Sequence, residues 1–193
     1  MSGETSPVPV GAQSEGPDWN VIVTLSEPTF HLARKLLSRW GRLRGTDYHN
    51  VAVMAVPDTG LFLKEFAAAV AESPGILNAM SHVVPLEHVF RFKDAAEFEA
   101  KSREIALSYV PRLAGKAFHV RLHRRGLKGI ISTPAEERFL DDTLLDALAA
   151  AGTPGRIRFD DADYVLLIET LAGAAGMALW SREDVERHPF LGI

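Results

Sequence analysis

A run of basic side chains between Lys116 and Lys128 has the residue types and spacing best suited to binding phosphate. Guanidinium groups bind phosphate through charge-assisted, often bidentate hydrogen bonds. Gly126 and Gly129 would let backbone N–H groups approach the phosphate closely. The alternative is a solvated charged edge without a ligand. The residues that we predict to contact nucleic-acid phosphates are Lys116, His119, Arg121, His123, Arg124, Arg125 and Lys128.

This basic run is conspicuous because the whole chain of 193 residues is acidic, with a net charge of −4. Residues 112–132 contain six Lys and Arg and no acid. A second acid-free stretch, residues 28–46, contains Arg34, Lys35, Arg39, Arg42 and Arg44. A local basic face matters more for binding phosphate than the charge of the whole chain does. Both stretches are therefore candidate phosphate-binding surfaces.

Histidines and aspartates offer a metal-binding alternative, but their spacing argues against it. His119 and His123 lie four residues apart on a predicted strand, about 13 Å at the usual rise. One tetrahedral ion cannot bind both at ~2.1 Å. Asp160, Asp161 and Asp163 do not follow the spacing of a calcium-binding EF-hand loop, and we interpret them as turn residues. The sequence therefore predicts no metal and no cofactor.

The common catalytic motifs are absent from the sequence. It has no Cys, which excludes disulfides, thiolate metal ligands and cysteine nucleophiles. It also has no P-loop, no Rossmann glycine motif, no nucleophile elbow and no zinc-protease motif. We therefore predict that the chain catalyses nothing itself. Without a long apolar run or a secretory signal, we expect a cytoplasmic protein that does not enter a membrane.

The hydrophobic pattern predicts two α+β units that would position the basic residues. Residues 1–17, rich in Ser, Pro, Gly and Glu, are predicted to be a disordered tail. Residues 18–92 show a strand–helix–strand–helix–strand pattern compatible with a small ferredoxin-like unit. Pro85 lies within its third strand and favours an edge position or a bulge. The predicted strands are 20–25, 51–56 and 83–92, and the predicted helices begin near 28 and 62.

Residues 93–193 are predicted to form the second unit. Asp94 and Glu97 form a capping box that starts a helix at residues 95–110. The alternation in residues 117–123 then places the apolar side chains in a core and His119, Arg121 and His123 on the opposite face. A second capping box at 133–136 starts the next helix, and an apolar strand follows at 164–171. Phe118 and Phe139 could stack on bases, but their apolar stripes favour core packing.

The segment from Asp94 to Ser181 resembles a THUMP domain, an RNA-binding module of tRNA-modifying enzymes. The likeness rests on a capped helix leading into AFHVRLHRRG, then a helix, then RIRFDDADYVLLIE. Ala162 stands where the family usually has Pro. Upstream, WNVIVTL and VVPLEHVFRF are similar to single-chain THUMP proteins that assist tRNA cytidine acetylation, with His82 in place of the usual Arg.

The resemblance implies an α+β protein with a ferredoxin-like unit at 18–92 and a THUMP unit at 93–193. It also implies a protein that binds tRNA and presents it to a separate modifying enzyme, an RNA cytidine acetyltransferase. Two alternatives remain open at this point. One is an enzyme of RNA metabolism with an unrecognised active site, and the other is a structural protein without an RNA role.

Overall fold

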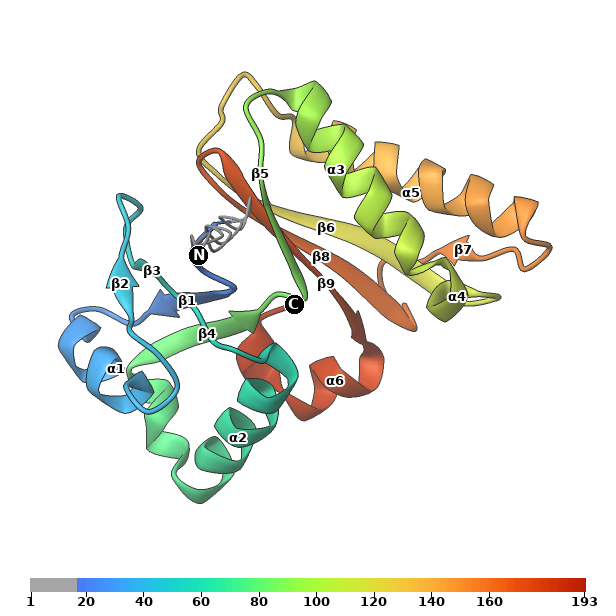
Figure 1. Cartoon of the computed structure of the whole chain (residues 1–193). Helices are drawn as coiled ribbons and strands as arrows, with labels where there is room; N and C mark the ends of the chain where they lie inside the picture. Colours follow the sequence, from blue (N-terminus) through green and yellow to red (C-terminus); the bar gives the residue numbers. More distant parts are fainter. Residues whose placement is uncertain (1–16) are drawn as a thin grey trace, which may run out of the picture.

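The structure, a computed structural model, describes residues 17–193 and contains two β-sheets flanked by helices (Figure 1). The strand order is β2-β3-β1-β4 in the first sheet and β5-β9-β8-β6-β7 in the second. The predicted α+β class is therefore confirmed. Of the predicted tail at 1–17, all but Pro17 lies outside the described residues.

The first sheet belongs to a ferredoxin-like βαββαβ unit whose strands all pair antiparallel. Its α2 helix begins after Asp58, whose carboxylate accepts a hydrogen bond from the Leu61 N–H at 2.8 Å. The two-residue strand β2 was not predicted. In chain order the elements are β1 (Val21–Leu25), α1 (Phe30–Leu37), β2 (Arg44–Gly45), β3 (Val51–Met54), α2 (Thr59–Glu72), η1 (Pro74–Asn78) and β4 (Met80–Pro85).

The strand predicted at residues 83–92 is in fact two strands in different sheets. The first, β4, is an edge strand that ends at Pro85, as the proline indicated. The second, β5 (His88–Arg91), pairs with β9 (Ala174–Ser181) of the other sheet. Between them, the Leu86 side chain lies directly over Gly176, in the space that a Cβ at this position would occupy. This close approach helps to join the two sheets.

The second unit has a mixed sheet in which β6 and β8 are parallel neighbours joined through α5. The helix predicted at 95–110 ends at Ser108, and Pro111 lies in the first turn of the short helix α4. The second predicted capping box is wrong: Thr133 is already helical, and the Glu136 side chain is buried in the protein. The elements are α3 (Ala95–Ser108), α4 (Val110–Leu113), β6 (Ala117–Arg125), α5 (Thr133–Ala150), β7 (Arg156–Ile157) and β8 (Tyr164–Leu171).

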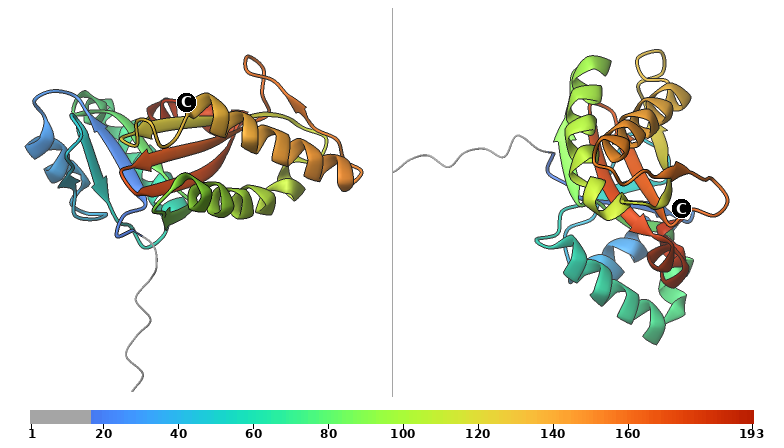
Figure 2. Two further views of the ribbon diagram at one scale, coloured as in Figure 1. Left: turned by 90° about the horizontal axis from the view of Figure 1, so that it is seen from above. Right: turned by 90° about the vertical axis from the view of Figure 1, so that its right-hand side faces the viewer.

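The two faces of the second sheet are covered by different parts of the molecule (Figures 1 and 2). Helices α3 and α5 cover one face, where Leu166 and Ile168 join their hydrophobic core. Leu167, which points the other way, joins the core of the first unit. After β9 the chain forms α6 (Arg182–Arg187) and η2 (Pro189–Leu191), neither of them predicted, and the Phe190 ring lies 5.0 Å from that of Phe66. No helix within residues 17–193 is long and apolar enough to cross a membrane.

Candidate nucleic-acid interface

Strand β6 directs four of the seven predicted residues, His119, Arg121, His123 and Arg125, to the face of the sheet opposite α3 and α5. Phe118, Val120 and Leu122 are buried in the core beneath those helices, which confirms the predicted facing of this strand. Because β7 pairs only with the start of β6, the outer edge of β6 continues without a strand partner. Carboxylates of α5 accept its N–H groups instead: Asp141 from Val120 at 3.0 Å and Glu137 from Leu122 at 2.8 Å.

A buried carboxylate holds two of the seven predicted residues. Glu169 in β8 is 2% exposed, and its oxygens contact the side chains of His123 and Arg125. The His123 Nδ1 lies 2.8 Å from Glu169 Oε1, and the Arg125 guanidinium forms an ion pair with Oε2. This pairing reduces the positive charge that His123 and Arg125 present to a ligand. Sequence reasoning assigned Glu169 no role because it lies within an apolar strand.

The remaining predicted residues do not form one cluster. Arg121 is exposed, and its side chain makes no hydrogen bond or ion pair with any other residue in 17–193. Arg124 is partly buried and donates to the Gly126 carbonyl at 2.6 Å, whereas Lys128 is exposed in the following loop. Lys116 lies just before β6, at the other end of this nine-residue strand. The predicted site is therefore spread along the strand, with Arg124, Arg125 and Lys128 at one end.

The glycine loop after β6 lies against the first unit. Gly126 has a φ of +83°, and the Tyr48 hydroxyl from the β2–β3 loop lies where a side chain would project. The Arg125 carbonyl also accepts a hydrogen bond from the Ala172 N–H at 3.2 Å, in the β8–β9 turn. The Tyr48 contact places the loop that carries Lys128 against the first unit, and the Ala172 hydrogen bond joins it to the β8–β9 turn.

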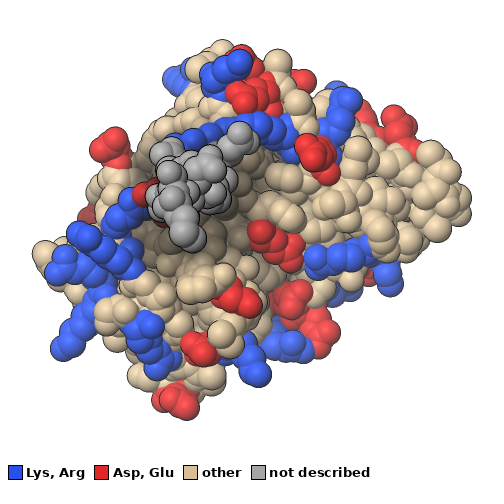
Figure 3. All heavy atoms as spheres, viewed as in Figure 1, with Lys and Arg blue, Asp and Glu red and all other residues tan. Residues whose placement is uncertain are grey.

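The second acid-free stretch forms a basic surface on the first unit, which we call the α1 surface. Around a shallow hollow of about 540 Å³ it gathers polar and basic residues and no acid: His31, Arg34, Lys35, Ser38, Gly41 and Arg42. Arg34, Lys35 and Arg42 are exposed and have no ion-pair partner in the described chain. In Figure 3, Lys and Arg side chains gather at the left edge, where α1 lies in Figure 1.

Arg44 of the same stretch is already paired and is not part of the α1 surface. Its guanidinium lies 2.6 Å from the Asp18 carboxylate. This hydrogen bond holds the pKa of Asp18 below its usual value. Only part of the acid-free stretch therefore presents uncompensated charge.

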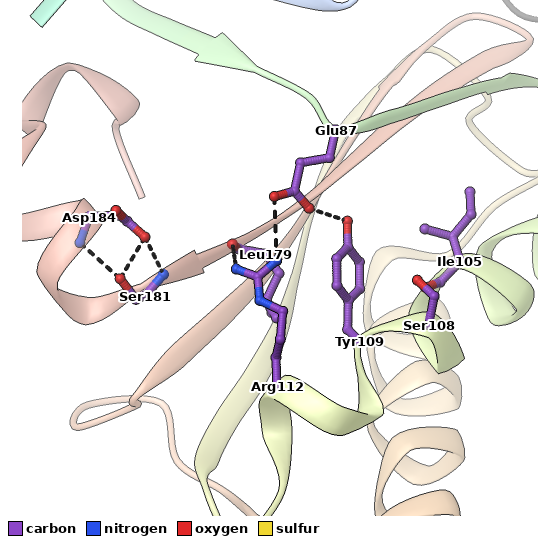
Figure 4. Close-up of polar contacts among 8 residues, drawn as sticks. All are labelled: Glu87, Ile105, Ser108, Tyr109, Arg112, Leu179, Ser181 and Asp184. Atoms are coloured by element: carbon purple, nitrogen blue, oxygen red, sulfur yellow. Dashed lines mark hydrogen bonds and ion pairs between the residues drawn. The ribbon is translucent and has the colours of Figure 1, made fainter. Parts of the chain in front are cut away.

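A polar cluster near the junction of the two units satisfies its own hydrogen bonds (Figure 4). The Tyr109 hydroxyl donates to Glu87 at 2.6 Å, and Arg112 donates to Glu87 at 3.4 Å and to the Leu179 carbonyl at 3.0 Å. Burial and the Glu87 carboxylate raise the pKa of Tyr109. Arg112 belongs to the acid-free run at 112–132. Its contact with Glu87 holds the segment between β4 and β5.

The metal and stacking alternatives can be compared with the geometry. Among residues 17–193 no group of three or more His, Asp or Glu side chains is placed to hold a metal ion. Phe118 is fully buried, as predicted, and Phe139 is partly buried with the Arg103 guanidinium 4.8 Å from its ring centroid. The aromatic side chain that sequence reasoning missed is Phe159, which is 72% exposed. The only sequence signal of this exposed ring was Asp160-Asp161, which directly follows Phe159 and ends the alternating pattern of residues 156–159.

Neither a family model nor a curated protein matches the sequence, whereas solved structures share its fold. PH1313 from Pyrococcus horikoshii Ot3 is 13% identical with a TM-score of 0.57, over 83% of this chain and 54% of that one. TrmN from Thermus thermophilus is 16% identical with a TM-score of 0.58, over 83% and 44%. A 4-thiouridine synthetase solved with RNA and ATP is 11% identical with a TM-score of 0.54, over 84% and 41%. The chain therefore has a THUMP-like fold and spans about half the length of these proteins.

These likenesses overturn the prediction that the chain catalyses nothing itself. The fold is shared with an enzyme, the 4-thiouridine synthetase, and that comparison covers 41% of the synthetase chain. Missing catalytic motifs were therefore weak evidence, because a site can be built from residues outside any recognised motif. The absence of those motifs does not separate this chain from enzymes.

Proposed function

We propose that this chain binds tRNA on its basic surfaces and holds it for chemical modification. The observation that carries the proposal is the α1 surface, an acid-free cluster of exposed cations on a protein with a net charge of −4. Such a cluster attracts the phosphate backbone, which dominates the affinity of proteins for nucleic acids. The likeness to a synthetase solved with RNA supports the same conclusion, as does the THUMP resemblance.

The proposed interface has two parts, on the two units. The first part is the α1 surface, with Arg34, Lys35 and Arg42. The second part consists of the seven residues singled out in the sequence, which lie along β6 and in the segments on either side of it. Within it Arg121 and Lys128 are the exposed cations best placed to contact phosphate. The pairing with Glu169 suits His123 and Arg125 to shaping this face more than to binding phosphate themselves.

The finer proposal concerns the enzyme that modifies the bound tRNA. The resemblance to single-chain THUMP proteins supports an RNA cytidine acetyltransferase as the partner. A tagged chain recovered from its own cells, with its RNA sequenced and its proteins identified by mass spectrometry, tests this assignment. Recovery of tRNA together with such an enzyme is the expected result. Recovery of tRNA with a different modifying enzyme contradicts the assignment and leaves RNA binding intact.

The RNA interface is tested by charge reversal in the full chain. Arg34→Glu with Lys35→Glu should weaken tRNA binding at least tenfold, as should Arg121→Glu with Lys128→Glu. Each lost phosphate contact should reduce the slope of log K against log salt by roughly 0.7–0.9. Fluorescence anisotropy with labelled tRNA at several salt concentrations measures both quantities.

The matched control is Arg138→Glu with Arg156→Glu, which makes the same change in net charge on α5 and β7. Both residues are exposed and belong to neither basic surface. This variant should bind tRNA nearly as well as the unaltered chain. Equal weakening by all three variants would mean that only the total charge matters. A chain that does not bind tRNA at all would overturn the proposed function.

A further inference from the structure

Phe159, in the connection between β7 and β8, is the most exposed large hydrophobic residue of the described chain, at 72%. Single exposed apolar side chains are common on protein surfaces, so exposure alone identifies no site. What distinguishes Phe159 is the rigidity of its loop and the groups that surround its ring.

The backbone on both sides of Phe159 is fixed by hydrogen bonds. Before it, the Arg158 N–H donates to the Phe118 carbonyl at 3.0 Å, and the Arg158 carbonyl lies 2.9 Å from His119 Nδ1. After it, the Asp163 N–H donates to the Ala117 carbonyl at 2.8 Å, and the Asp163 carboxylate accepts from the Ala117 N–H at 2.8 Å. The exposed ring therefore projects from a preorganised loop, which lowers the entropic cost of binding a ligand.

Arg182, the first residue of α6, binds the same loop through hydrogen bonds and an ion pair. Its guanidinium donates to the Ala162 carbonyl at 3.1 Å and to the Asp161 carbonyl at 3.2 Å, and lies 2.8 Å from the Asp161 carboxylate. This leaves Asp160 as the loop carboxylate with no hydrogen bond or ion pair among residues 17–193.

The ring of Phe159 forms part of the wall of an open hollow of about 470 Å³, which we call the Phe159 pocket. The His119 ring lies beside it, with ring centroids 5.3 Å apart and planes tilted by 43°. The volume falls in the range of pockets that bind small molecules. The residues of the pocket used below are His119, Arg121, Phe159 and Asp160.

The polar groups of the pocket match a nucleotide better than they match a bare anion. Arg121 offers an uncompensated guanidinium and Asp160 an uncompensated carboxylate beside the two rings. A bare phosphate or carboxylate would meet repulsion from Asp160 and from Glu186, which also lines the pocket. A nucleobase instead presents a flat face for Phe159, an amino group for a carboxylate and a linked phosphate for Arg121.

We propose that the Phe159 pocket binds one unpaired nucleobase of the RNA, stacked on Phe159 beside His119. Asp160 accepts a hydrogen bond from an exocyclic amino group of that base, so the pocket prefers cytosine, adenine or guanine to uracil. Arg121 contacts the neighbouring phosphate. This inference rests on the proposed function and adds to it a subsite that reads a base.

The test uses the full chain with single-stranded hexamers of cytidine, adenosine and uridine, followed by fluorescence anisotropy. Phe159→Ala should weaken binding of the cytidine and adenosine hexamers about tenfold, the scale of one lost stacking contact. It should leave the salt slope unchanged, because a phenyl ring displaces no counterion. Phe159→Tyr keeps an aromatic face and should bind as the unaltered chain does. The melting temperature should stay the same in both variants, since the ring is exposed.

Asp160→Asn tests the preference among bases. Loss of the carboxylate should reduce the preference for the cytidine over the uridine hexamer, while Asp146→Asn, an exposed aspartate of α5, should leave it unchanged. Equal binding of the Phe159→Ala variant and the unaltered chain to every hexamer would overturn the inference. Binding of whole tRNA separates this result from the proposed function. If the Phe159→Ala variant and the unaltered chain bind tRNA equally, the proposed function still stands. If the unaltered chain binds no tRNA, the proposed function is overturned.

Free cytidine and adenosine monophosphates separate the two sources of a base. Binding of the hexamer at least tenfold more tightly than the monophosphate supports RNA as the ligand, because neighbouring phosphates then add contacts. Equal binding of the two would show a site for free nucleotides and overturn the assignment to RNA.

Discussion

Asp141 makes the stability of this protein depend on pH, because one buried carboxylate supports the edge of β6. Its side chain accepts the Val120 N–H, and burial raises its pKa from 3.8 to about 7. Between these values the folded protein keeps a proton that the unfolded chain has released. The stabilisation that comes from protonated Asp141 is therefore complete below the unfolded-state pKa of 3.8. It is lost as the pH rises through the folded-state pKa of about 7.

Asp141→Asn should abolish this part of the pH dependence. Asparagine keeps an oxygen that can accept the Val120 N–H, but it does not titrate. Urea unfolding should be measured at several pH values between 4 and 8. The free energy of unfolding of the unaltered protein should fall relative to that of the variant, by about 1.4 kcal/mol for each pH unit between the two pKa values. Asp146→Asn, at an exposed carboxylate of the same helix, is the control and should keep the dependence. Parallel curves for Asp141→Asn and the unaltered chain would contradict the assignment.

At the scale of elements, the loop after β6 depends on one glycine that meets a side chain of the first unit. Gly126 has a φ of +83°, and the Tyr48 hydroxyl fills the space where a Cβ would project. Gly129 in the same loop has a φ of +82°, but nothing lies within 4 Å of its Cβ position. The two glycines share the same backbone strain and differ in steric contact.

Gly126→Ala should therefore destabilise the protein more than Gly129→Ala does. Each should cost about 1 kcal/mol for a positive φ, and Gly126→Ala should add a steric cost of a similar size. Combining Gly126→Ala with Tyr48→Phe, which removes the hydroxyl, should recover part of the difference. Denaturant titration of the single and double variants gives these free energies of unfolding. Equal losses for the two glycine variants would show that the contact between loop and first unit does not contribute.

At the scale of the whole molecule, residues from both ends of the sequence share one hydrophobic core. Trp180 and Phe190 join the buried cluster that contains Trp19 and most of the first unit. The predicted division into units at 18–92 and 93–193 stays a prediction about independent folding. This shared core favours unfolding of both parts together.

Two optical signals can test this cooperativity, because all three tryptophans lie in or against the same cluster. Tryptophan fluorescence therefore reports on the first core, whereas far-UV circular dichroism includes α3 and α5, which pack in the other core. We expect one midpoint for both signals in a urea titration. A fluorescence transition clearly separated from the circular dichroism transition would show that the two cores unfold independently.

Local pattern in the sequence was enough to determine the strand and helix content that builds the basic face. The alternation from Phe118 to His123 predicted correctly which side chains are buried, because a strand turns successive residues to opposite faces. Asp94 was predicted correctly as a helix cap, since it accepts the Glu97 N–H at 2.9 Å within four residues. The long strand at 164–171 was also predicted from its apolar run.

Only the tertiary structure decided which cations are free to bind a ligand. Arg125 is paired with Glu169, Arg44 with Asp18 and Arg112 with Glu87, and each pair joins residues at least 25 positions apart in the sequence. The folding of the chain also divided the segment at 83–92 between two sheets and left Phe159 exposed. A charge count in the sequence cannot foresee such pairing, because the field at a side chain depends on neighbours that the fold brings close.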